Sequence, residues 1–167
     1  MSNTEKDWKT DWAENLKRLG CLIAIICFVA VVAGLFAPFH SPKHRAEDLL
    51  KKGAAAFDAQ DFEAAAKNFV LAAELGNAEA QSKLATCYYD GVGVKKDDAE
   101  AVKWFRKAAE QGNAEAQFHL AAYYCNGIVV ERDLSEAVKW LRKAADQGMP
   151  QAVMRVDVLE SAMQEQE

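Results

Sequence analysis

The chain has 167 residues, of which 51% are hydrophobic and 27% are charged, and its formal net charge is −5 at pH 7. Residues 46–167 contain 14 Lys and Arg against 21 Asp and Glu, so this part alone carries 14 − 21 = −7 charges. An acidic surface repels phosphate groups, which argues against nucleic acid or anionic lipid as a partner of this part.

Residues 1–18 form an N-terminal tail in which apolar residues recur at helical spacing. Trp8, Trp12, Leu16 and Leu19 fall three or four residues apart, and most of the positions between them are polar or charged. Tryptophan favours the boundary between lipid and water. We interpret the tail as an interfacial helix; a disordered tail is the alternative.

Residues 19–39, LGCLIAIICFVAVVAGLFAPF, contain no charged side chain. A helix of this length extends about 32 Å at ~1.5 Å per residue, enough to cross a hydrocarbon core of about 30 Å. The segment therefore predicts a single transmembrane helix. A cleavable signal peptide is the alternative, because small residues occur at Val32-Ala33-Gly34. The apolar run continues past them to Phe39, which favours an uncleaved anchor.

The orientation of this segment is not decided by charge, because four Lys or Arg residues precede it and four follow it closely. A short N-terminal tail before a signal-anchor-like segment favours a cytoplasmic N-terminus. We therefore expect a single-pass protein of the cell membrane, with a linker at residues 40–45 and the repeat domain outside the cytoplasm, in the periplasm if the source is bacterial. The cysteines favour the opposite side, because they lack the regular pairing of a disulfide framework.

Residues 77–112 and 113–148 are two copies of one 36-residue unit, identical at 22 positions. Apolar residues at helical spacing predict two helices in each copy. The second helix of each copy starts after Asp-x-x-Glu, at Asp97 and Asp133, a capping-box arrangement. Gly112 and Gly148 provide the left-handed residue that ends it. A unit of this length cannot bury its apolar face alone, so neighbouring units must stack into a solenoid.

The two copies resemble the Sel-one-like repeat (SLR) family, a relative of the tetratricopeptide repeat (TPR). The first copy carries the family pattern at Ala80, Leu84, Tyr88, Gly91, Gly93, Val94, Asp97, Ala101, Trp104, Lys107, Ala108, Ala109 and Gly112. The second copy carries most of the same pattern, but Val129 replaces the glycine at position 93. We expect a different loop there, because a β-branched residue disfavours positive φ.

The flanking segments extend the array. Residues 46–76 lack the Gly-x-Gly loop and resemble a plain TPR, while residues 149–167 resemble another first helix, a cap that ends in a polar tail. The predicted fold is all-α: a short right-handed α-solenoid of seven TPR/SLR-like helices, preceded by a single transmembrane helix.

We find no sequence motif for catalysis, metal binding or a cofactor. Some members of the SLR family are linked to β-lactam binding or hydrolysis, but no serine here has the lysine of a Ser-x2-Lys motif. We therefore expect a protein that is not an enzyme and needs no cofactor or metal.

By the resemblance, the first helix of each repeat lines a concave surface that binds a protein or peptide partner. The candidate partner-binding residues are Leu50, Phe57, Glu79, Ser82, Thr86, Tyr89, Asp90, Glu115, Phe118, Asn126 and Met154. A structural role in the core is the alternative, above all for Phe57.

The sequence thus predicts a membrane-anchored scaffold or adaptor that binds a peptide or protein partner on its concave face. Two alternatives remain. One is an envelope hydrolase or small-ligand receptor, β-lactamase-like or otherwise related to the cell wall. The other is a structural membrane protein that associates with itself.

Overall fold

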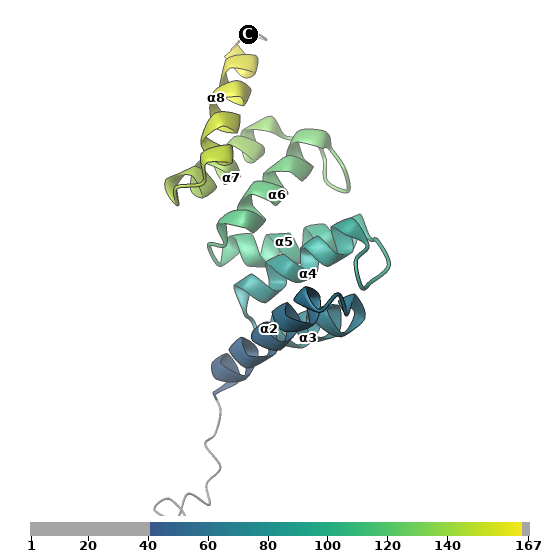
Figure 1. The fold of residues 1–167 in the computed structure, drawn as a ribbon. Coiled ribbons are helices and arrows are strands. Elements are labelled where there is room, and N and C mark those ends of the chain that lie inside the picture. Colours follow the sequence, from purple (N-terminus) through teal and green to yellow (C-terminus); the bar gives the residue numbers. More distant parts are fainter. Residues whose placement is uncertain (1–40, 165–167) are drawn as a thin grey trace, which may run out of the picture. The chain divides into compact units, whose positions relative to one another are not determined.

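A computed structural model describes residues 41–164, which fold into seven α-helices (Figure 1). The helices are α2 (Pro42–Asp58), α3 (Phe62–Glu74), α4 (Ala78–Asp90), α5 (Asp98–Glu110), α6 (Ala114–Asn126), α7 (Leu134–Asp146) and α8 (Pro150–Gln164). The predicted tail at 1–18 and the predicted transmembrane helix at 19–39 lie outside the described residues. None of the helices within residues 41–164 combines the length and the hydropathy that crossing a membrane requires.

The helices pair and stack in chain order. Helix α2 packs against α3, α4 against α5, and α6 against α7, while α3, α5 and α7 each also contact the first helix of the following pair. This arrangement confirms the predicted all-α solenoid, in which every pair has a neighbour to cover its apolar face.

The core runs through the whole stack, and each of its clusters joins helices of neighbouring repeats. One cluster joins α3 to α4 through Phe69 and Leu84, and a second joins α5 to α6 through Phe105 and Leu120. Trp104 packs against both of these clusters, as expected for a side chain that fills the gap between repeats. Buried alanines on every helix let the backbones approach closely.

The predicted helix starts at residues 98 and 134 are confirmed, but the capping box is only half formed. Asp97 accepts hydrogen bonds from the amides of Ala99 and Glu100. Glu100 does not reach back to the cap and binds Lys103 Nζ at 2.9 Å, because the amide of Asp97 already donates to Tyr88 O. The Asp97 side chain therefore fixes the start of the helix. The hydrogen bond from the Asp97 amide to Tyr88 O takes the place of the one that Glu100 would accept in a complete capping box.

Two further expectations were wrong. Residues 42–45 of the predicted linker are helical, because Ser41 caps α2 by accepting from the His44 amide and Pro42 occupies the first turn. The loop of the second copy keeps the shape of the first, since Val129 adopts φ 65° where Gly93 adopts φ 71°. The surrounding repeat thus imposes a left-handed conformation on a β-branched residue.

Candidate functional site

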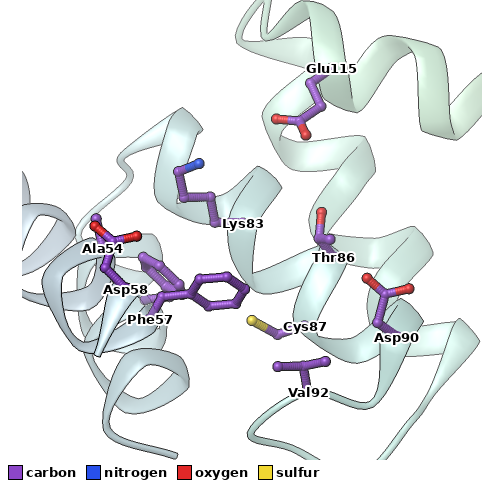
Figure 2. A pocket seen from close by; sticks show the side chains of 10 residues that line it. Ala54, Phe57, Asp58, Lys83, Thr86, Cys87, Asp90, Val92 and Glu115 are labelled. Atoms are coloured by element: carbon purple, nitrogen blue, oxygen red, sulfur yellow. The ribbon is translucent and has the colours of Figure 1, made fainter. Parts of the chain in front are cut away.

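A groove opens between α2, α4 and the start of α6, each the first helix of its repeat (Figure 2). Its volume is about 200 Å³. Ten residues line it: Ala54, Phe57, Asp58, Phe69, Lys83, Thr86, Cys87, Asp90, Val92 and Glu115. Because three successive repeats contribute to it, the groove forms only when the repeats are stacked.

The groove has an apolar centre. Phe57, which is 43% exposed, contacts Phe62 edge-on with ring centroids 5.2 Å apart. Figure 2 shows the Phe57 ring directed from α2 toward the sulfur of Cys87 on α4. Val92, in the loop after α4, also lines this centre. An apolar side chain of a ligand would therefore find aromatic and aliphatic surface here.

Charged groups surround this centre. Asp58, Asp90 and Glu115 contribute three carboxylates from three different helices, and Lys83 contributes one ammonium. Glu115 is held by Ser82, whose hydroxyl lies 3.4 Å from Glu115 Oε2 and links α4 to α6. With three negative groups and one positive group, the groove favours a cationic ligand group beside the apolar one.

The Cys87 thiol is kept neutral by its surroundings. Burial raises its pKa, and the nearby carboxylate of Asp90 raises it further, while Lys83 acts in the opposite direction. Cys87 and Cys125 are both free cysteines. A neutral thiol is a poor nucleophile, so Cys87 contributes to the groove as a small apolar group.

Beyond the groove, the surface formed by the first helix of each repeat, called the inner surface below, carries a cluster of aromatic side chains around His119. The His119 ring stacks on Phe105 with centroids 4.8 Å apart, and the centroids of Tyr89 and Phe118 lie 6.1 and 5.9 Å from that of His119. Burial lowers the pKa of His119, although the carboxylates of Glu115 and Asp90 act to raise it. The Arg155 guanidinium lies over the Phe118 ring, 5.3 Å from its centroid. These contacts connect the inner surface directly to the core.

The structure brings four of the eleven predicted partner-binding residues together in the groove: Phe57, Thr86, Asp90 and Glu115. The other seven do not line it; six of them lie on α2, α4 or α6, and Met154 lies on α8. Glu79, Asn126, Met154 and Tyr89 are at least partly exposed, the last at 42%. Phe118 is half-buried against the cluster that joins α7 to α8.

One predicted contact residue, Ser82, was misplaced. Ser82 is fully buried, because its short side chain faces α6 and bonds to Glu115, so it acts by positioning a carboxylate. Leu50 is half-buried against the cluster between α3 and α4, and its contact with a partner stays a prediction.

The sequence analysis missed several residues that line the groove, namely Phe69, Lys83, Cys87 and Val92. One signal was present: Cys87 occupies the repeat position of Tyr123, 36 residues later. The smaller side chain leaves space between repeats where the tyrosine fills it. Lys83 follows Ser82 and lies one turn before Cys87, so a wider helical face would have included both.

The groove has features that suit the binding of a side chain. No set of three or more His, Cys, Asp or Glu side chains in residues 41–164 is arranged to hold a metal ion. In the groove, the carboxylates and the lysine surround an apolar centre, and the one thiol there is held neutral. Such a surface recognises a side chain by shape and charge.

A sequence profile of the Sel1 repeat matches residues 49–77, 78–113 and 114–149, which together exceed half of the chain. The chain belongs to the Sel1 repeat family. The first match covers the repeat that resembled a plain TPR in sequence. Sel1 repeat proteins are generally scaffolds that bind protein partners.

Several solved structures share the fold. A Sel1 repeat protein from Oxalobacter formigenes is 37% identical, with a TM-score of 0.61, over 65% of this chain and 43% of its own. The protective antigen c5321 of uropathogenic Escherichia coli is 31% identical, with a TM-score of 0.67, over 71% of this chain and 27% of its own. Cysteine-rich protein B of Helicobacter pylori is 20% identical with a TM-score of 0.52, over 66% of this chain and 94% of its own, and shows the fold alone.

The chain spans less than half the length of the first two of these proteins. No curated protein matches the chain. Membership of the family therefore establishes the fold of this chain and a general role in binding other proteins.

Proposed function

We propose that this Sel1 repeat protein is a scaffold that binds a segment of a partner protein in the groove between α2, α4 and α6. The observation that carries the proposal is the combination of an apolar centre with three carboxylates from three repeats. Each helix supplies one acidic group, so a bound segment would contact successive repeats at once. This is how a repeat array obtains affinity from a shallow surface.

The groove favours a segment in which an apolar side chain stands next to a lysine or arginine. The apolar side chain would lie against Phe57 and Cys87, and the cation would reach Asp58 or Asp90. Charge-assisted hydrogen bonds of this kind contribute about 1.5–3 kcal/mol when water is largely excluded. Lys83 would select against a second cation placed near the middle of α4.

The scaffold would act at a membrane. Support comes from the uncharged run Leu19–Phe39, which is long enough for a single transmembrane helix. With a cytoplasmic N-terminus, the groove would face the outside of the cytoplasm. Extraction tests this part separately: the full chain should require detergent to leave the membrane, and a variant with charged residues within 19–39 should not.

Photo-cross-linking in intact membranes tests the groove. A photoreactive amino acid at position 58 lies on its rim, and one at the exposed position 139 on α7 provides the matched control. We expect a discrete partner adduct from position 58 only, and a weaker adduct when Asp90→Asn is added. Equal adducts from both positions would reject the groove. A product containing only this chain would indicate self-association instead.

A further inference from the structure

The loop between α6 and α7 exposes aliphatic side chains that the corresponding loop between α4 and α5 does not. Ile128 and Val129 are 47% and 55% exposed, whereas Val92 and Gly93 at the same repeat positions are only partly exposed. Both loops lie on the same side of the stack in Figure 1. Val129 also holds a left-handed conformation, which is unfavourable for an L-residue and most of all for a β-branched one. The loop thus retains a strained, exposed valine where glycine would fit.

The glycine at the equivalent position of the earlier loop leaves no room for a side chain. Gly93 approaches α3 so closely that a Cβ would lie 2.0 Å from Phe62 O. Val129 carries such a Cβ, and a cleft of about 380 Å³ opens beside it, between the loop and α5. The lining is Ala99, Val102, Lys103, Arg106, Lys107, Glu110, Val129 and Val130. Three of these residues are cationic and one is acidic.

The cations of this cleft are not fully neutralised by the protein. Arg106 Nη2 donates to the Tyr124 hydroxyl at 3.2 Å, and Lys107 Nζ lies 4.1 Å from the centre of the Trp104 ring. Neither has an ion-pair partner among the described residues. Lys103 differs, because it binds Glu100 at 2.9 Å.

The next repeat shows what Arg106 lacks. Arg142 occupies the same repeat position, and its Nη2 lies 2.7 Å from Glu160 Oε1 on α8. Glu160 stands where Tyr124 stands one repeat earlier. The replacement of this carboxylate by a hydroxyl leaves the charge of Arg106 available to an outside group, beside the exposed aliphatic loop.

We propose that the cleft between α5 and residues 127–130 is a second docking site, which takes an acidic segment of a partner protein. A carboxylate of the segment binds Arg106 and Lys107, and a neighbouring aliphatic side chain packs against Val129 and Val130. Charge complementarity selects this occupant, since Arg106 and Lys107 have no ion-pair partner among residues 41–164 and the lining carries only the single carboxylate of Glu110. The site is independent of the groove on α2, α4 and α6, which favours the opposite charge.

Fluorescence anisotropy with the full chain in non-ionic detergent tests the proposal. The probes are two labelled peptides, one of alternating glutamate and leucine (ELELE) and one in which glutamine replaces glutamate (QLQLQ). We expect saturable binding of the acidic peptide only, weakening as salt is added. Arg106→Gln should reduce its affinity about tenfold, because a charge-assisted contact is lost. Arg142→Gln, the matched control, should not change it.

Val129→Gly provides a second variant that separates docking from folding. It removes an apolar contact and relieves strain, so binding should weaken while the melting temperature rises. Equal binding of both peptides, or equal loss in Arg106→Gln and Arg142→Gln, would overturn the proposal. A concentration-dependent dimer in sedimentation that Arg106→Gln abolishes would also overturn it, because the occupant would then be a second copy.

Discussion

Gly93 lies so close to Phe62 that a Cβ built on it would be 2.0 Å from Phe62 O and 2.5 Å from Phe62 C. The contact joins the loop after α4 to the start of α3 in the preceding repeat. Backbone atoms at the start of a helix cannot move aside without disturbing its first turn. The glycine is therefore required for this approach, and its φ of 71° also favours glycine.

Gly93→Ala should accordingly destabilise the protein by about 2–4 kcal/mol, since it adds a clash with backbone to an unfavourable φ. Chemical denaturation followed by circular dichroism measures the loss. Gly76→Ala is the control, because Gly76 has a φ of 89° but a Cβ added to it would meet no atom within 4 Å. A loss in Gly93→Ala no larger than in Gly76→Ala would show that the loop can withdraw from α3.

Val129→Gly should have the opposite effect on stability. Glycine removes the left-handed strain of about 1–2 kcal/mol, and its greater freedom in the unfolded chain offsets roughly 0.5–1 kcal/mol of the gain. We expect a net increase in the free energy of unfolding of about 0.5–1 kcal/mol, visible as a higher melting temperature in calorimetry. A lower melting temperature would mean that the Val129 side chain makes stabilising contacts that outweigh its backbone strain.

Cys87→Tyr should close the groove. Tyr123 occupies the same repeat position, is buried in the core cluster between α5 and α6, and donates a hydrogen bond to Asp98 Oδ1 at 3.0 Å. A tyrosine at position 87 would extend toward Phe62, the counterpart of Asp98, and occupy the space beside Phe57. The cross-linked adduct from position 58 should then disappear while the melting temperature stays near that of the wild type.

Cys87→Ser is the control for that variant, because it keeps the small volume and should retain the adduct. Loss of the adduct together with a collapse of the helical signal would mean that the tyrosine unfolds the repeat. Retention of the adduct in Cys87→Tyr would place the partner elsewhere on the inner surface.

The periodic parts of the chain could be predicted from sequence, because helix starts and stops are local. Asp97 and Gly112 act within a few residues of their own position, through a side-chain cap and a left-handed stop. The orientation of Ser82 is not local. Its burial depends on where α6 places Glu115, a contact between residues 33 positions apart. Residues that serve one helix were therefore predicted better than residues that join two.

The groove illustrates the same distinction. Positions shared by all repeats pointed to Phe57, Thr86 and Asp90, which do line it. The cavity itself arises from a difference between repeats, the cysteine at 87 against the tyrosine at 123. A family pattern describes what repeats have in common, and so it predicts which helices form the binding surface. The groove and the cleft lie where the chain departs from that pattern, at Cys87 and at Val129.

His119 should make the stability of the domain depend on pH. Burial lowers the pKa of its imidazole below 6.5 in the folded state, where the ring stacks on Phe105, while the unfolded chain titrates near 6.5. The unfolded state therefore binds more protons as the pH falls below 6.5, and the free energy of unfolding decreases until the folded-state pKa is reached. Above pH 6.5 both states are neutral and this stabilisation is fully present. Denaturant titrations between pH 7.5 and 5 should show the decrease in the wild type and a smaller one in His119→Gln, and parallel curves would contradict the assignment.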